Sequence, residues 1–414
     1  MTRPHALRTL TVSAAFAAFV LALPAEAHAQ RVQLDVKATG DFGRELSDAI
    51  REITRGVADA IRDVSRDLGR ELGQNLGSNF GRDIGRELGK GLRDLPGIAR
   101  DLGAFDGGWA MAQDRNWRGK ADDRQTRALA IGTSGSIELH NLSGDITVTV
   151  SSGRDATVEL VRHSRGRTDA DARLGLERVK VDTQVAGTRA IIKADYPNDR
   201  QAPYSVAIDM IVSAPAGTSV IVKSVSADVK VTGIKGELAI TTISGGITLT
   251  NVGVVSEAKT ASGDVTVSGA STDGTLDVGT LSGDVTLRQV KARKINASTV
   301  SGTVGAHDVI CDSATLSTMS GDAVFAGEIS RNGRYEITSH SGDVQFSPTG
   351  SAGYSLTATS FGGDINSSVA LQGDAGNRGR SRQRSLSGKV GDGSATVKLQ
   401  TFNGDITIGA SRRR

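Results

Sequence analysis

Hydrophobic and polar residues follow one template ten times along the chain. It reads apolar-x-apolar-x-Thr-x-Ser-Gly-Asp-(Val/Ile)-x-apolar, and residues 276–287 and 316–325 are good copies. The residue at the Ser position anchors each copy. The anchors are Ser143, Ser226, Ser244, Ser262, Ser282, Ser301, Ser320, Ser341, Gly362 and Asn403. From Ser226 to Gly362 they are 18, 18, 20, 19, 19, 21 and 21 residues apart. This period predicts an all-β, β-helix-like solenoid with 18–21 residues per coil.

The position of the apolar residues predicts two main strands per coil, joined at a corner. Around Ser282, alternate residues are apolar before and after the anchor, but the alternation slips by one residue across Gly283-Asp284. Alternate side chains of a strand point to opposite faces, so the slip marks a bend between two strands. Glycine tolerates the backbone angles of a corner, and Asp bonds nearby N–H groups in turns. The expected core positions of this coil are Leu276, Val278, Val285 and Leu287.

A column of hydroxyl side chains points inward beside the corners. Because buried polar groups are costly when unpaired, we expect each hydroxyl to bond a backbone group or its neighbour in the next coil. The members are Thr242, Thr260, Thr280, Thr299, Thr318, Ser339, Ser360 and Thr401.

The first 29 residues predict a secretory signal peptide. Arg3 and Arg8 precede the apolar run 10–23, and 27–29 reads Ala-His-Ala, a small-x-small cleavage site. No later stretch is long and apolar enough to span a membrane. We therefore expect an exported protein, periplasmic or on the cell surface, that is not integral to a membrane.

Residues 30–103 predict a separate amphipathic helical module. From Leu68 to Leu88 an apolar residue recurs every fourth position and is followed by glycine. These glycines define a candidate helix-packing face: Gly69, Gly73, Gly77, Gly81, Gly85 and Gly89. One interpretation is a glycine zipper that packs on another helix or a membrane surface, with self-association through residues 44–95. The other is a plain helical stalk.

The rest of the chain divides into a linker and the solenoid domain. Residues 104–127, with Trp109 and Trp117, are expected to be the linker, and 128–410 the β-solenoid. Within it, 150–215 predicts an irregular cap with a short helix near 168–177, a hairpin around Ala186-Gly187 and a strand over 204–214. A basic excursion, 372–393, precedes the final coil, and 411–414 is a basic tail.

Two segments resemble a known family. Residues 212–220, Val-Ser-Ala-Pro-Ala-Gly-Thr-Ser-Val, precede the tandem Ser-Gly-Asp-Val coils, and 401–408 reads Thr-Phe-Asn-Gly-Asp-Ile-Thr-Ile. These features resemble the bacterial putative-adhesin β-strand-repeat family, an envelope domain of unknown function, over residues 128–410. The resemblance implies the repeat fold and carries no catalytic or binding residue to transfer.

Chemistry is sparse in the repeats. Stacked template aspartates such as Asp264 and Asp284 repel one another, so either turn hydrogen bonds or calcium must compensate. Turn bonds are favoured because Gly246 and Thr303 interrupt the column. No catalytic constellation, metal-ligand spacing or cofactor motif occurs. We expect a non-enzymatic structural or adhesion protein of the cell envelope. The alternatives are a polysaccharide-acting enzyme on a parallel β-helix, or an accessory or sensor protein that docks a partner through its N-terminal helix.

Charge is concentrated near the end of the sequence. Residues 371–414 contain nine Lys/Arg and three Asp, a local net charge of 9 − 3 = +6. In an extended chain Arg378, Arg380, Arg382 and Arg384 would share one face and suit an anionic envelope polymer or a lipid surface. The alternative is a solvated tip that prevents end-to-end stacking. Export makes nucleic acid an unfavoured partner.

Overall fold

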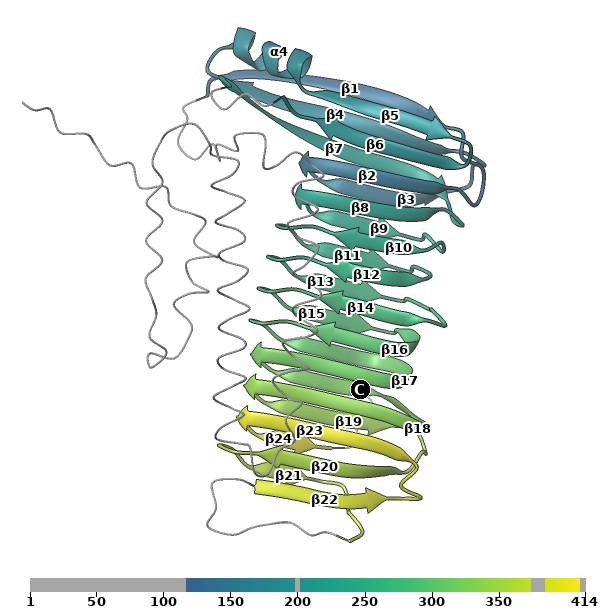
Figure 1. Cartoon of the computed structure of the whole chain (residues 1–414), viewed down its shortest axis with the longest axis vertical. Coiled ribbons are helices and arrows are strands. Elements are labelled where there is room, and N and C mark those ends of the chain that lie inside the picture. Colours follow the sequence, from purple (N-terminus) through teal and green to yellow (C-terminus); the bar gives the residue numbers. More distant parts are fainter. Residues whose placement is uncertain (1–116, 198–201, 374–383, 410–414) are drawn as a thin grey trace, which may run out of the picture.

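A computed structural model describes residues 117–197, 202–373 and 384–409. Within these ranges the chain forms one 24-stranded sheet wound into a tall, narrow solenoid (Figure 1). The predicted signal peptide, the helical module with its six glycines, Arg378, Arg380, Arg382 and the basic tail lie outside them. Among the described helices, none is long and apolar enough to cross a membrane.

Each coil contains a leading strand that runs up to the anchor and a trailing strand that starts after the corner. The leading strands are β2 (Ser136–Ser143), β8 (Ser219–Ser226), β10 (Leu238–Thr241), β12 (Val255–Lys259), β14 (Thr275–Gly279), β16 (Lys291–Ser298), β20 (Tyr354–Ser360) and β23 (Ala395–Asn403). The trailing strands are β3 (Ile146–Ser151), β9 (Val229–Thr232), β11 (Ile247–Thr250), β13 (Val265–Ser268), β15 (Val285–Arg288), β19 (Val344–Thr349), β21 (Ile365–Ser367) and β24 (Ile406–Ile408). Two long strands, β17 (Val304–Ser320) and β18 (Ala323–Ser341), are trailing at their start and leading at their end.

Equivalent residues of successive coils pair in parallel register. Val265 pairs with Val285, and Val285 with Val304. Leu276, Val278, Val285 and Leu287 are fully buried, and Asp284 is exposed at the corner, as the template predicts. The leading strands form one layer of the solenoid, here called the leading sheet, and the trailing strands form the other, the trailing sheet. The core is therefore a stack of mostly aliphatic side chains between these two layers.

The coils do not stack entirely in chain order. β23 pairs in parallel with β18 on one side and with β20 on the other. β24 lies in the same way between β19 and β21. The coil anchored at Asn403, expected to be the final one, is thus inserted between the coils of Ser341 and Gly362. All three coils carry the same template, so their strands can be neighbours in either order.

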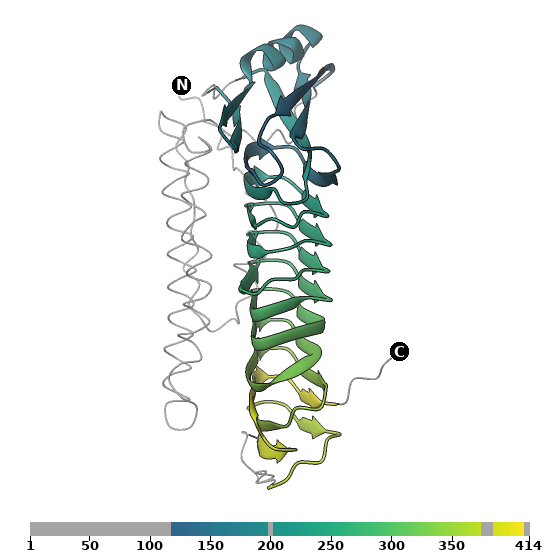
Figure 2. The same ribbon diagram turned by 90° about the vertical axis from the view of Figure 1, so that its right-hand side faces the viewer.

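A cap closes the end that precedes the first coil. β4 (Ala156–Gly166) pairs antiparallel with both β1 (Gly119–Leu129) and β7 (Tyr204–Pro215), and β7 extends the trailing sheet beside β3. The hairpin of β5 (Lys180–Ala186) and β6 (Arg189–Asp195) extends the leading sheet beside β2. Helix α4 (Asp169–Arg178) packs against β1, β4 and β7 (Figure 2). The expected hairpin, helix and strand are all present.

The linker boundary needs correction. Residues 119–127, expected within the linker 104–127, belong to β1. Their inward side chains include Asp123, Gln125 and Arg127 rather than apolar residues, so no hydrophobic alternation marks the strand. It is a strand because it pairs along its whole length with β4.

The opposite end is covered by part of the basic excursion. β22 (Arg384–Val390) pairs antiparallel with β20, and Gln372 bridges to Lys389 on β22. An antiparallel strand at the end of a parallel stack breaks the repeat.

Candidate functional site

The Ser-Gly-Asp corner depends on glycine for two reasons. Gly283 has φ +141°, and a Cβ built there would lie 2.3 Å from the carbonyl oxygen of Gly263 in the preceding coil. The same two conditions hold at Gly245, Gly263, Gly302, Gly321 and Gly342. A larger residue would therefore strain the backbone and push adjacent coils apart.

The template aspartates form a ladder of hydrogen bonds along the corner. Asp264 Oδ1 accepts the backbone N–H of Asp284 at 2.8 Å, and Asp284 Oδ1 accepts that of Thr303 at 2.7 Å. Each carboxylate thus bonds the equivalent residue of the next coil. The further rungs, acceptor first, are Asp228–Gly246, Asp322–Asp343, Asp343–Asp405 and Asp405–Asp364. The expected turn stabilisation is present, but it joins successive coils rather than closing one turn.

The inward hydroxyls form a second ladder. Thr280 Oγ1 donates to the carbonyl oxygen of Gly263 at 2.9 Å, and Thr299 Oγ1 to that of Gly283 at 2.9 Å. Equivalent bonds are made by Thr260, Thr318, Ser339, Thr401 and Ser360. The prediction that these hydroxyls bond backbone groups is confirmed at these positions. The repeated polar residues therefore support the stack of coils.

Residues on the outer face of β2 form a cluster of ionisable groups. Arg189 Nη2 donates to Glu138 Oε2 at 2.5 Å, His140 Nε2 lies 2.9 Å from Glu138 Oε1, and Lys223 Nζ lies 3.5 Å from the same oxygen. Glu138 and His140 expose little of their side chains. Sequence reasoning missed this cluster, although their spacing of two residues on one strand places them on the same face.

The protonation states of the cluster limit its chemistry. Burial raises the pKa of Glu138, but hydrogen bonds from Arg189 and His140 and the nearby charges outweigh it and lower the pKa to about 2. Burial lowers the pKa of His140 despite its bond to Glu138. At neutral pH the carboxylate is ionised and held by Arg189, so Glu138 is a poor proton donor and a weak base. The arrangement suits a structural ion network.

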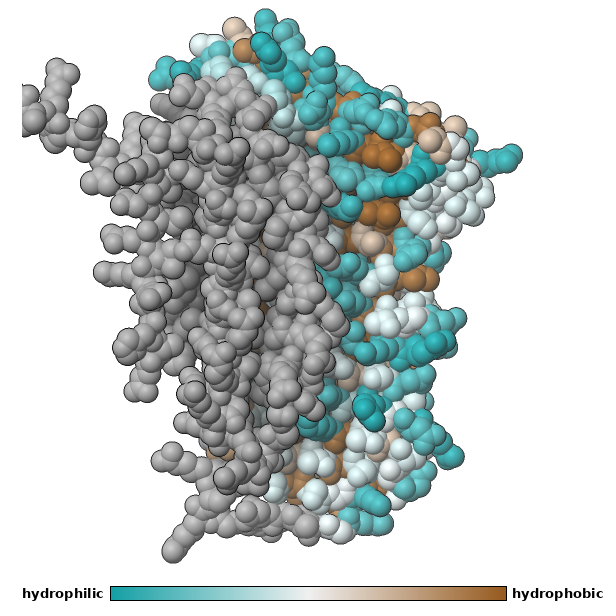
Figure 3. Space-filling model, in the orientation of Figure 1, coloured by the Kyte–Doolittle hydropathy of each residue, from teal (hydrophilic) through white to brown (hydrophobic). Residues whose placement is uncertain are grey.

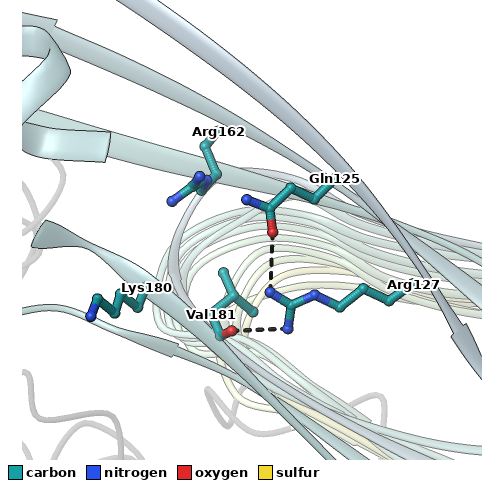
Figure 4. A pocket seen from close by; sticks show the side chains of 5 residues that line it. All are labelled: Gln125, Arg127, Arg162, Lys180 and Val181. Carbon is teal, nitrogen blue, oxygen red and sulfur yellow. Dashed lines mark hydrogen bonds between the residues drawn. The ribbon is translucent and has the colours of Figure 1, made fainter. Parts of the chain in front are cut away.

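The cap contains a hollow of about 170 Å³ lined by residues of β1, β4 and β5 (Figure 4). Arg127 is one of the lining residues: its Nη1 donates to the Val181 carbonyl oxygen at 3.0 Å, and its Nη2 donates to Gln125 Oε1 at 3.1 Å. Arg162 pairs with Asp123 and donates to the Leu176 and Val179 carbonyl oxygens. Both guanidinium groups hold the cap together.

The predicted site residues fall partly outside the described residues. Of the four arginines, Arg384 is described, at the start of β22, where it pairs with Asp364. The structure does not place Arg378, Arg380 and Arg382, or the six glycines of the helix-packing face. Among the described residues, no group of three His, Cys, Asp or Glu side chains is arranged to hold a metal ion. Cys311 is buried, which raises the pKa of its thiol to about 12.

The trailing sheet presents an outward column of mostly hydrogen-bonding side chains. Its members, in spatial order, are Thr147, Lys230, Thr248, Thr266, Thr286, Gly305, Val324, Gln345, Thr407 and Asn366. Parallel strands space equivalent side chains at about 4.8 Å. In Figure 3 the visible described surface is mostly hydrophilic or intermediate, with separate apolar patches.

Comparison with known proteins gives one family. The family model described as Toastrack DUF4097 matches residues 136–409. No functionally curated protein matches the chain significantly.

Solved structures of low sequence identity also match. A putative adhesin from Parabacteroides distasonis ATCC 8503 is 13% identical, with a TM-score of 0.36, and one from Bacteroides fragilis NCTC 9343 is 12% identical, with a TM-score of 0.33. Each match covers 70% of this chain and 97% of the other. A putative cell adhesion protein from Clostridium sporogenes ATCC 15579 is 10% identical, with a TM-score of 0.20, over 70% of this chain and 100% of the other.

Proposed function

The chain belongs to the Toastrack DUF4097 family, and we propose that it is an exported, non-enzymatic interaction protein of the bacterial cell envelope. In this proposal the solenoid is a rigid rod that carries regularly spaced contact groups. Its ladders of Asp and Thr bonds hold the coils in register, so the spacing of the outward groups is fixed.

The observation that carries this proposal is the outward column of the trailing sheet. Thr248, Thr266 and Thr286 repeat one side chain on three consecutive coils. Hydroxyl groups at about 4.8 Å spacing can hydrogen-bond repeatedly to an extended polymer. The partner class is therefore an envelope polymer, with the basic excursion around Arg384 as a second, anion-directed contact.

Fractionation of cells that express a tagged chain, combined with crosslinking in the cell, tests this function. A photoreactive residue at the exposed Thr248 should crosslink to envelope material, whereas the same residue at the buried Val267 should not. Recovery in the cytosolic fraction, or equal crosslinking from both positions, would contradict the proposal.

The enzymatic alternative has a separate test. Purified protein is incubated with acidic envelope polysaccharide while newly formed chain ends are measured. We expect no time-dependent release. Release that is abolished by Glu138→Gln would assign catalysis to the Glu138 cluster and overturn the non-enzymatic proposal.

A further inference from the structure

An apolar column follows the outside of the solenoid immediately before each anchor. In spatial order it contains Leu142, Val225, Ile243, Ala261, Leu281, Val300, Met319, His340, Phe402 and Phe361. Nine of these ten side chains are apolar. The rings at the far end stack, with centroids 5.0 Å apart for His340 and Phe402 and 5.4 Å for Phe361 and Phe402. By strand parity all ten point away from the core.

None of these outward side chains is exposed. Ala261 and Val300 are only 5% and 6% accessible, and the other members are at most partly accessible. The outward column two residues earlier also has no exposed member, and its Thr338 and Gln400 are only 4% and 8% accessible. In spatial order this column contains His140, Lys223, Thr241, Lys259, Gly279, Ser298, Ser317, Thr338, Gln400 and Thr359. On the trailing sheet, by comparison, five of the ten outward residues are exposed, four are half-buried and Gly305 is buried; the exposed ones are Lys230, Thr248, Gln345, Thr407 and Asn366. We call these two adjacent columns of the leading sheet the covered band.

No helix among the described residues covers the band. α4 is the only helix within the described residues, and it packs on β1, β4 and β7 at the cap. In addition, four polar atoms of the band are buried without a hydrogen-bond partner among the described residues, as are some polar atoms elsewhere, such as Thr218 Oγ1; the four are His140 Nδ1, Ser317 Oγ, His340 Nδ1 and Gln400 Oε1. Buried polar atoms normally find partners, so these four indicate a covering element with polar groups of its own.

We propose that the covered band is the docking surface of residues 44–95 of the same chain. The segment has what the band requires: an apolar stripe over Leu46–Leu68, a continuation at every fourth residue to Leu88, and polar residues on the remaining positions. Its six glycines remove side chains beside the stripe, which allows a helix to approach a flat sheet closely.

The glycine-bearing half of the segment matches the band in length. Ten coils at about 4.8 Å give a band of roughly 43 Å. As a helix, residues 68–92 would be about 37 Å long, whereas the whole of 44–95 would extend to about 78 Å, so 68–92 is the part that fits along the band. Residues 96–116 connect the segment to the cap, and 21 residues can span up to about 70 Å. The linker therefore lets the segment reach any coil. Docking uses the glycine face intramolecularly, in place of self-association.

Thiol labelling of the full chain tests the proposal. Leu281→Cys reports on the band, and Thr248→Cys reports on the exposed trailing sheet; Cys311, buried and with a raised thiol pKa, is a slow background. We expect Leu281→Cys to react much more slowly with a maleimide than Thr248→Cys. Ile243→Cys provides a second band position if Leu281→Cys folds poorly.

Paired substitutions in the segment identify the occupant. Leu76→Asp with Phe80→Asp places two charges in the apolar stripe, and Gln74→Asp with Ser78→Asp places the same charges on the opposite side of a helix. The first pair should raise the labelling rate in the band by about tenfold or more, and the second should leave it unchanged. Thr248→Cys should be unaffected by either pair.

Three results would overturn the proposal. The band cysteine could react as fast as Thr248→Cys, both Asp pairs could leave its protection intact, or protection could fall on dilution. The last result would assign the band to a second copy of the chain.

Discussion

The carboxylate of Asp284 accepts the backbone N–H of Thr303 at 2.7 Å, one coil further along the solenoid. The bond explains why the template keeps a charged residue at a corner where carboxylates are stacked. Each template carboxylate except that of Asp364, in the last coil, bonds an N–H donor of the next coil, which offsets the repulsion between neighbours. The ladder lacks a carboxylate at two places, Gly246 and Thr303, so no template carboxylate of the described coils accepts the N–H of Asp264 or of Asp322.

Restoring a missing rung should stabilise the protein. Gly246 has no positive φ, and a Cβ there would meet only ordinary contacts, the nearest at 3.5 Å from the Asp264 carbonyl oxygen. Gly246→Asp should therefore gain a hydrogen bond to the Asp264 N–H and about 1 kcal/mol of unfolding free energy relative to Gly246→Ala. Urea unfolding measures the difference. If Gly246→Asn raises the unfolding free energy and Gly246→Asp does not, the repulsion between the new carboxylate and Asp228 outweighs the new hydrogen bond.

Gly283→Ala should be strongly destabilising. The new Cβ combines a φ of +141° with a distance of 2.3 Å to the Gly263 carbonyl oxygen. Strain and overpacking together should cost about 3 kcal/mol or more. The control is Gly274→Ala, where the nearest atom is 3.5 Å away and φ is not positive. Equal melting temperatures for the two variants would contradict the close-approach argument.

A charge in the core should prevent stable folding. Val285 is fully buried between the two sheets, so Val285→Asp places an unpaired carboxylate among aliphatic side chains. The expected loss exceeds about 4 kcal/mol. Thr286→Asp, on the neighbouring outward position, should change the unfolding free energy by less than about 1 kcal/mol. A cooperative unfolding transition of Val285→Asp near that of the parent would show that this side chain is not in the core.

Acid should weaken the protein through Glu138. Its pKa is about 2 in the folded chain against 4.5 for an ordinary Glu, so its contribution is complete above pH 4.5. This contribution is lost as the pH falls from about 4.5 to 2, because Glu138 then binds a proton more readily in the unfolded chain than in the folded one. The contribution of Glu138 to the unfolding free energy is at most about 3 kcal/mol. Glu138→Gln should flatten this part of the stability profile, measured by urea unfolding at each pH. An unchanged slope would show that Arg189 does not hold the carboxylate in solution.

Binding of the basic excursion to anionic surfaces should depend on salt. Changing Arg378, Arg380, Arg382 and Arg384 to Ser should reduce cosedimentation with anionic vesicles and acidic polysaccharide, and raised salt should have the same effect on the parent. Arg384→Ser alone should have a smaller effect, because its guanidinium already pairs with Asp364. Arg293→Ser with Lys294→Ser, at exposed positions of β16, is the control. Binding by the four-Ser variant equal to the parent would make the excursion a solubilising tip.

The structure of a single coil could be predicted from the sequence, but the order in which the coils stack could not. The template predicts that Val285 is buried and that Thr280 is hydrogen-bonded, because side-chain parity follows from the pleat alone. The stacking order depends on competition between near-identical strands. The position of the coil anchored at Asn403, between the coils of Ser341 and Gly362, could therefore not be predicted. β1 was missed because the inward residues at its centre, Asp123, Gln125 and Arg127, are polar. The Glu138 cluster was missed because Arg189 and Lys223 come from other strands.

The inserted coil has a consequence for how the protein is completed. Chain synthesis proceeds from the N-terminus, so Tyr354–Ser367 is available before Ala395–Ile408. Until the later segment arrives, the edges of β18 and β19 have no permanent neighbour, and the earlier coil must either wait unpaired or bind there and be displaced. By either route, assembly of the rod ends when the later segment enters between two coils made earlier, so the last intermediate is one with an open strand edge.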